Sequence, residues 1–151
     1  MYTLHREQIL NTNIDKAWEF VKNPRNLNRI TPDNLDFTII SDLPDEMYNG
    51  LLIEYRVKLP LLGTRPWISE IKHIRPPYAF VDEQRIGPYK LWYHYHEIEQ
   101  IEKGVKMIDR VYYEMPFWLI GTLAHALIVK KKLAYIFDYR QQKLDEIFKN
   151  T

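Results

Sequence analysis

Hydrophobic and polar residues alternate along the middle of the chain, where apolar positions recur every second residue in six segments. This period of two indicates β-strands. Asn-Gly, Pro-Pro, Gly-Pro and Lys-Gly pairs lie between several of the segments, which predicts short turns. Strands joined directly by short turns form an antiparallel meander rather than parallel β-α-β units. The predicted strands lie near residues 35–39, 53–59, 67–72, 79–86, 91–101 and 105–115.

The beginning of the chain combines one strand with two short helices. Residues 2–10 read as a first strand. Apolar residues from Ile14 to Val21 then recur at helical spacing, behind Asn13 or Asp15 as the residue that starts the helix. A second short helix is predicted for residues 25–30.

The end of the chain is predicted to form one long helix, from Thr122 to Lys149. Its apolar residues repeat every three to four positions or multiples of them. The predicted stripe consists of Leu119, Leu123, Leu127, Ala134, Phe137, Leu144 and Phe148. A helix of this length with an apolar stripe must lie across the sheet. The fold class is therefore α+β, in the order β-α-α-β6-α, and residues 1–151 are predicted to form a single domain.

Strand alternation also predicts which residues face the long helix, because successive side chains point to opposite sides of a sheet. On the strand at residues 91–101, the apolar Trp92 and Ile98 are predicted to face inward. His94 and His96 lie at the same alternate positions, so their side chains point to the same face. The same parity on neighbouring strands turns Phe80, Met107, Val111 and Tyr113 inward. The predicted inner face thus carries five polar side chains, Asp82, Gln84, His94, His96 and Asp109.

Five polar groups on an inner face need partners, since each unpaired group costs about 1–3 kcal/mol when buried. In one interpretation they satisfy one another in a network that stiffens the sheet. In the other they line a cavity with an apolar end and a polar end, the usual pattern of a small-molecule site. A tight hairpin at residues 101–105 places His96 opposite Asp109, whereas a bulge at Gly104 shifts that register by one.

Composition narrows the classes of function. The 21 basic and 20 acidic residues give a formal charge of +1, which predicts no nucleic-acid partner. Cysteine is absent from the sequence, which excludes disulfides and thiolate chemistry. Charges near the start leave no room for a signal peptide, and no apolar run reaches the length of a membrane span. We therefore expect a cytoplasmic protein.

Seven short motifs occur along the chain: Phe80-Val-Asp-Glu-Gln84, Gly87-Pro88, Trp92-x-His94-x-His96-x-Ile98, Asp109-Arg-Val-x-Tyr113, Pro116-Phe117, Leu123-Ala-His125 and Ile136-Phe-x-Tyr-Arg140. They resemble those of the START-like and Bet v 1-like (SRPBCC) superfamily, which includes polyketide cyclases and lipid-transfer domains. Ile98 stands where we would expect Phe, which keeps the position apolar. The resemblance implies a helix-grip fold, in which a curved antiparallel sheet wraps around a long C-terminal helix. It also implies an internal cavity for a small hydrophobic or aromatic ligand.

The first functional hypothesis is a binding module without a cofactor. Its expected ligand-binding residues are Trp67, Asp82, Gln84, Trp92, His94, His96, Asp109, Tyr113, Leu123 and Leu127. The aromatic and leucine side chains would form the apolar wall, and the amide, imidazole and carboxylate groups would orient a polar group of the ligand.

Three alternatives stay open. In a cyclase or dehydratase, His96 oriented by Asp109 would act as acid or base, with both as the candidate catalytic residues. A regulatory or scaffold domain would use the polar interior only structurally. His94, His96 and Asp109 could also ligate a metal, although the cupin motif that this segment resembles is off by one residue. We expect no metal.

Tyr93 and Tyr95 point outward and are candidates for a homodimer surface.

Overall fold

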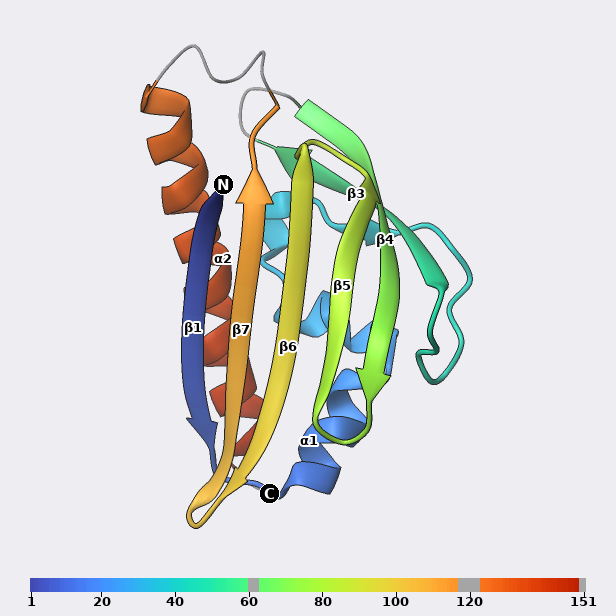
Figure 1. The fold of residues 1–151 in the computed structure, drawn as a ribbon, viewed down its shortest axis with the longest axis vertical. Coiled ribbons are helices and arrows are strands. Elements are labelled where there is room, and N and C mark those ends of the chain that lie inside the picture. The colour runs from blue at the N-terminus through green and yellow to red at the C-terminus, as the bar shows by residue number, and fades with distance from the viewer. Residues whose placement is uncertain (60–62, 117–122, 150–151) are drawn as a thin grey trace.

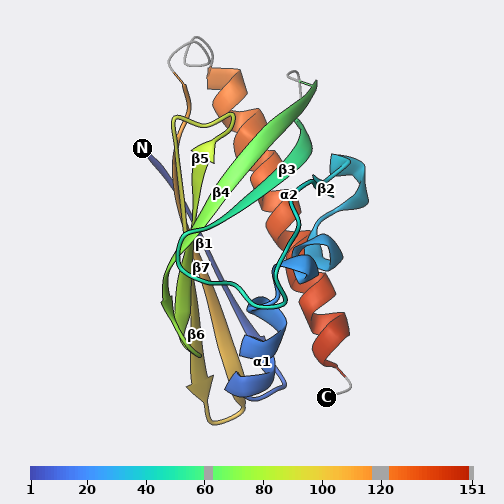
Figure 2. The same ribbon diagram turned by 90° about the vertical axis from the view of Figure 1, so that its right-hand side faces the viewer.

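The computed structural model describes residues 1–59, 63–116 and 123–149, with the backbone alone for Leu59 and residues 123–126. A seven-stranded antiparallel sheet curves around a long helix (Figure 1 and Figure 2). The elements are β1 (Tyr2–Leu10), α1 (Ile14–Val21), the 3₁₀ helices η1 (Pro24–Ile30) and η2 (Asp33–Leu35), β2 (Thr38–Ile39), β3 (Leu51–Leu59), β4 (Gly63–Arg75), β5 (Ala79–Ile86), β6 (Leu91–Ile101), β7 (Gly104–Glu114) and α2 (Leu123–Phe148).

The strands lie in the order β1-β7-β6-β5-β4-β3-β2, so β2 to β7 form a meander and β1 joins it at the far edge. The predicted α+β order and helix-grip architecture are confirmed. The sheet bends around α2 in the view of Figure 2. Two register irregularities between β4 and β5, at Ile68/Ser69 and Lys72/Arg75, contribute to this bend because a bulge increases local twist.

The helix α1 begins where the sequence predicts it. The Asn13 side chain accepts a hydrogen bond from the Lys16 backbone N–H at 2.9 Å, which satisfies one of the free donors at the helix start. Ala17, Trp18 and Phe20 are buried on the side facing the sheet. The amphipathic pattern therefore anchors α1 over the lower end of the sheet (Figure 1).

The next predicted elements differ in detail from those observed. The second helix is a 3₁₀ helix that starts at Pro24, where a proline loses no hydrogen bond. The strand predicted at residues 35–39 is reduced to Thr38–Ile39. Asp33–Leu35 form a 3₁₀ turn instead, and Asp36 follows with a left-handed φ of 45°, which breaks the extended run.

The β6–β7 hairpin takes the tight form, and its register aligns the polar residues. Ile101 pairs with Gly104, and His96 pairs with Asp109, with no bulge between them. Gly104 has a φ of +129°, and a Cβ there would lie 2.1 Å from the backbone oxygen of Leu10. A glycine is required at this turn both for its conformation and for the close approach of β1.

The long helix α2 buries Leu133, Phe137, Leu144 and Phe148 against the sheet and η1. The prediction that Leu127 belongs to the buried stripe is wrong, since its side chain is 53% exposed. Leu127 lies ten residues before Phe137, and at about 100° per residue this turns it roughly 80° away from the buried line. The predicted wall residue Leu123 has a side chain outside the described part of the structure.

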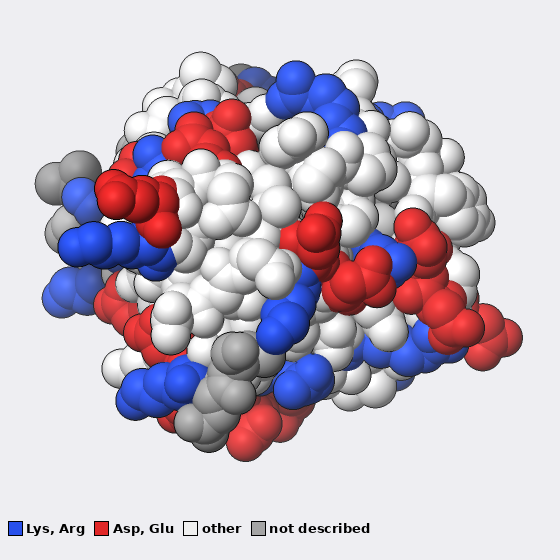
Figure 3. All heavy atoms as spheres, turned by 90° about the horizontal axis from the view of Figure 1, so that it is seen from below, with Lys and Arg blue, Asp and Glu red and all other residues white. Residues whose placement is uncertain are grey.

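Seen from below, acidic and basic side chains are interspersed around an uncharged area (Figure 3). Neither sign of charge forms a continuous patch on this face. Within the described ranges, no helix combines the length and hydropathy that crossing a membrane requires.

Candidate functional site

A cavity of about 100 Å³ lies between the inner face of the sheet, η1 and α2. Apolar side chains from all three parts line it, among them Leu27, Ile30, Ile53, Ile71 and Leu144. Polar side chains line it from the strands, from η1 with its N-cap residue, and from α2. These are Asn23, Asn26, Tyr55, Ser69, Asp82, His94, His96, Asp109 and Arg140.

Two histidines share one carboxylate at the centre of the polar wall. The Asp109 Oδ1 lies 2.8 Å from His94 Nε2 and 3.1 Å from His96 Nδ1. The His96–Asp109 pair comes from the cross-strand register, and His94 reaches the same oxygen from two residues away on β6. Side-chain exposure is 3% for His94 and 16% for each of the other two. The polar residues therefore partly satisfy one another, as the network interpretation expects.

The environment keeps this group in a defined charge state. Burial lowers the pKa of His94 to about 3, and the neighbouring His96 ring adds to the lowering. Burial alone would raise the pKa of Asp109, but hydrogen bonds from His94 and His96 outweigh it and hold that pKa well below its ordinary value. Near neutral pH a neutral His94 thus donates to an ionised Asp109.

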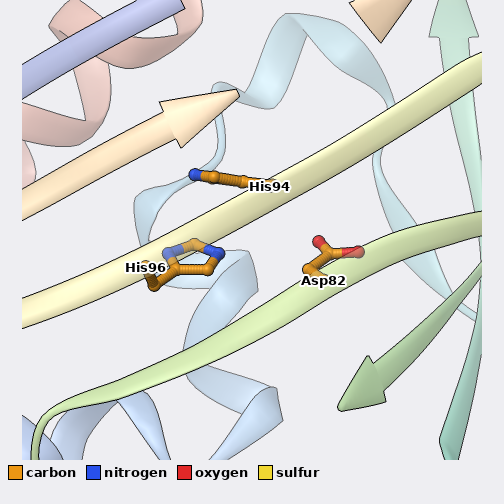
Figure 4. Close-up of side chains that lie close together, drawn as sticks. All are labelled: Asp82, His94 and His96. Carbon is orange, nitrogen blue, oxygen red and sulfur yellow. The ribbon is translucent and has the colours of Figure 1, made fainter. Parts of the chain in front are cut away.

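Stacking fixes the plane of the His96 ring. Its centroid lies 4.2 Å from the Phe80 ring at an interplanar angle of 10°, and 3.7 Å from the His94 ring. Phe80 is its cross-strand partner on β5. Figure 4 shows the rings of His94 and His96 and the carboxylate of Asp82 close together on one face of adjacent strands.

Asp82 is the least satisfied member of this wall. Its Oδ1 atom is buried and has no hydrogen-bond partner among the described residues. Burial raises the pKa of Asp82 above its ordinary value, although a hydrogen bond with Ser69 and the nearby His96 and Arg140 oppose the rise. The Ser69 Oγ in turn lies 2.7 Å from the Tyr55 hydroxyl and accepts from the Trp67 Nε1–H at 3.1 Å.

Arg140 enters the cavity from α2, opposite the sheet. Its Nε is buried without a hydrogen-bond partner among the described residues. Its guanidinium carbon lies 4.9 Å from the centroid of the Phe137 ring, one turn earlier on the helix. The charge of Arg140 lowers the pKa of both Asp82 and His94, as expected of a cation near them.

Of the ten predicted ligand-binding residues, four line this cavity, namely Asp82, His94, His96 and Asp109. Trp67, Trp92 and Tyr113 do not. Together with Tyr89 they form an aromatic cluster nearer the start of β6, with the Trp67 and Trp92 rings 5.3 Å apart and the Tyr89 and Trp92 rings 5.0 Å apart. These side chains pack against one another and are not part of this cavity's lining.

Gln84 does not reach the cavity either. Its Nε2 donates to the Tyr89 backbone oxygen at 2.7 Å, and its Oε1 accepts from the Tyr89 backbone N–H at 3.2 Å. A Cβ at Gly87 would lie 2.3 Å from that Oε1. The amide of Gln84 thus braces the turn between β5 and β6, because two backbone groups there complete its hydrogen bonds.

The geometry changes which residues could bind a metal. Asp82, His94 and His96 each bring one ligand atom within 4.8 Å of the others. Asp109, the carboxylate considered from the sequence, already binds both imidazoles and would act as an outer partner that orients them. A cation at this place would sit close to the charge of Arg140, which opposes metal binding.

The outward tyrosines of β6 are engaged by neighbouring cations. Arg75 donates to the Tyr95 hydroxyl, and Arg110 lies over the Tyr95 ring at 5.8 Å. Lys72 lies over the Tyr93 ring at 5.9 Å. These contacts are typical of the outer face of a sheet, and the homodimer stays a prediction.

Sequence reasoning missed several residues of the cavity. Arg140 lies three residues after Phe137 and four before Leu144, so a charged residue on the buried face was a readable signal. Ser69 lies two residues after Trp67 on β4, so strand alternation places its side chain on the same inner face. The residues of η1 carry no such signal, because an irregular segment has no period that shows which side chains turn inward.

Comparison with family models and with curated proteins finds no match, whereas solved structures match over nearly the whole chain. Protein Ms6760 from Mycobacterium smegmatis has a TM-score of 0.69 at 13% identity, covering 98% of this chain and 91% of that one. Ara h 8.0201, a Bet v 1 allergen, has a TM-score of 0.58 at 15% identity, covering 95% and 97%. The di-domain ARO/CYC StfQ from the steffimycin biosynthetic pathway has a TM-score of 0.72 at 11% identity, covering 98% and 50%. The chain therefore has a Bet v 1-like, helix-grip fold.

Proposed function

We propose that this domain binds a small, mainly apolar molecule in the cavity between the sheet, η1 and α2. The observation that carries the proposal is a cavity with mainly apolar walls whose lining includes Asp82 and Arg140, each with a buried polar atom (Oδ1 and Nε) that has no hydrogen-bond partner among the described residues. A purely structural network would complete its own hydrogen bonds. The His94–His96–Asp109 group does so in part, whereas Asp82 and Arg140 do not.

The size of the cavity supports the same proposal. Protein interiors are close-packed, with few voids larger than a water molecule. A single water needs about 10–15 Å³ of such space, so a cavity of about 100 Å³ has room for several waters or for one small organic molecule. Apolar side chains dominate the lining, which favours an organic occupant over a water cluster.

The likeness to StfQ and Ara h 8.0201 agrees with this proposal, because a Bet v 1-like fold builds an internal space between its sheet and its last helix. At 11% and 15% identity the likeness identifies no particular ligand. The argument for binding therefore depends on the cavity's own side chains.

The first experiment is native mass spectrometry of freshly purified protein, followed by titration with a neutral aromatic probe, cinnamamide. Leu27 in η1 lines the cavity, so Leu27→Trp should fill it and abolish both the retained mass and probe binding. Leu52 on β3 is 55% exposed, and Leu52→Trp is the matched control that should change neither. Equal binding by wild type and Leu27→Trp would contradict the proposal.

A second candidate function is acid–base catalysis in the same cavity, as a cyclase or dehydratase. The observation that favours it is the hydrogen bond between His96 Nδ1 and Asp109 Oδ1, which leaves the other ring nitrogen available to a bound molecule. Turnover of the retained compound tests it. His96→Gln should abolish turnover while binding persists, and failure of the wild type to convert the compound would leave the domain a binder.

A further inference from the structure

Arg140 holds a positive charge in the cavity wall that the described residues do not balance. An arginine side chain is always ionised and presents donors in a planar fork. No carboxylate within residues 1–59, 63–116 and 123–149 forms an ion pair with it at 4.0 Å or less. Its Nε lacks even a hydrogen-bond partner there. Arg140 as a residue is half-buried, with its Nε atom buried, so an anionic partner on the cavity side would compensate a donor that is otherwise unsatisfied.

The acids of the opposite wall are poorly suited to that role. Asp109 is already bound by two imidazoles, which hold its charge on the sheet side. Asp82 is hydrogen-bonded to Ser69 on the sheet side, and among the described residues no ion pair within 4.0 Å joins its carboxyl group to Arg140. The helix side of the cavity therefore carries a cation without a close acidic partner among the described residues.

We propose that the ligand is a small carboxylic acid with an apolar or aromatic body, whose carboxylate pairs with the guanidinium of Arg140. The apolar body would lie among Leu27, Ile30, Ile53 and Ile71, and Asp82 Oδ1 would contact a second polar position. This inference rests on the proposed function and adds the chemical class of the ligand. Arg140 suits the role because its fork matches the two oxygens of a carboxylate.

The same charge argues against the metal alternative at Asp82, His94 and His96. A divalent cation would add charge to a wall that already faces a guanidinium. Two of the four imidazole nitrogens are also used by Asp109. An anionic group relieves the unpaired charge of Arg140, whereas a metal ion increases the repulsion.

The test compares trans-cinnamate with its neutral amide, cinnamamide, by calorimetric titration at neutral pH. The wild type should bind the acid roughly tenfold or more tightly than the amide, the usual advantage of a buried charge-assisted pair. Arg140→Met should remove this preference and bring the affinities for acid and amide to within about twofold of each other. Arg140→Lys should keep part of the preference, because it retains the charge without the fork. Lys131→Met, on the exposed face of the same helix, is the charge-matched control and should keep all of it.

The outcomes separate this inference from the proposed function. Equal affinity for acid and amide in the wild type, or a preference that survives Arg140→Met, overturns the carboxylate proposal and leaves the binding cavity intact. Absence of binding by either compound overturns it as well, and the mass retained by the wild type, Leu27→Trp and Leu52→Trp in native mass spectrometry then decides the proposed function by itself. Stoichiometric Zn²⁺ binding that is lost in His96→Gln would also overturn it.

Discussion

The two ends of the space between sheet and helix are built from the same strands and differ completely in how they are filled. At one end the rings of Trp67, Tyr89 and Trp92 pack against one another edge-on or tilted. Toward the other end Asp109, Arg140 and their neighbours surround a cavity of about 100 Å³. Trp92 and His94 are only two residues apart on β6, so the change occurs within one repeat of a strand. Facing inward therefore does not decide whether a side chain packs or lines a void.

The largest expected effect is the loss of stability that follows when the packed aromatic end is disrupted. Trp92→Ala removes a buried ring that contacts Trp67, Tyr89 and Tyr113, and should lower the free energy of unfolding by about 3–5 kcal/mol. Urea denaturation measures the loss. A loss below about 1 kcal/mol would mean that the aromatic end is loosely packed and that the two ends do not differ as described.

The next effect measures how much the polar group at the cavity end contributes to stability. Asp109→Asn keeps an oxygen at the same place but removes the charge that both imidazoles contact, which should cost about 1–3 kcal/mol of stability. Thermal and urea unfolding at neutral pH check this. An unchanged stability would show that the His94–Asp109–His96 group contributes nothing net, and the network interpretation would lose its support.

Acidification should act through His94. Its pKa is about 3 in the folded protein against an ordinary value near 6.5, so the unfolded chain binds the extra proton first. Stability should therefore fall as the pH drops below about 6.5, by up to about 2 kcal/mol at pH 5. Because the pKa of Asp109 is lowered in the folded protein, stability falls further as the pH drops below the ordinary pKa range of an aspartate. The raised pKa of Asp82 has the opposite effect on stability.

The control for this pH dependence is His94→Gln, which cannot titrate and keeps a donor near Asp109. Its unfolding free energy should decline less between pH 7 and pH 5 than that of the wild type. Parallel curves for the two proteins would assign the acid sensitivity to groups other than His94.

The smallest effect separates Gln84 from the binding residues predicted by sequence. Gln84→Ala should cost about 1 kcal/mol, because it removes two hydrogen bonds that brace the turn at Tyr89. Binding of cinnamamide should stay within about twofold of wild type. A large loss of binding with unchanged stability would restore Gln84 to the cavity wall.

The sequence is sufficient for the long strands, the two α-helices and the face on which His94, His96 and Asp109 lie, because each depends on a period that one chain displays; the short strand near residues 35–39 is the exception. The His96–Asp109 pair depended on the hairpin at Gly104, for which two registers had been left open. Leu127 was misplaced because a ten-residue interval drifts away from the helix face of Phe137. Whether the inward side chains pack together or leave a cavity depends on contacts among β6, η1 and α2. These elements are far apart in the sequence, so no local pattern predicts their contacts.

The central claim is that a small molecule binds at the cavity end and not among the packed aromatic rings at the other end. A crystal structure with para-bromocinnamamide locates the bromine by its anomalous signal. The account predicts a bromine peak enclosed by η1, α2 and the strands that carry Ile53, Asp82 and His96. A peak among Trp67, Tyr89 and Trp92, or on the outer face of the sheet, would contradict it.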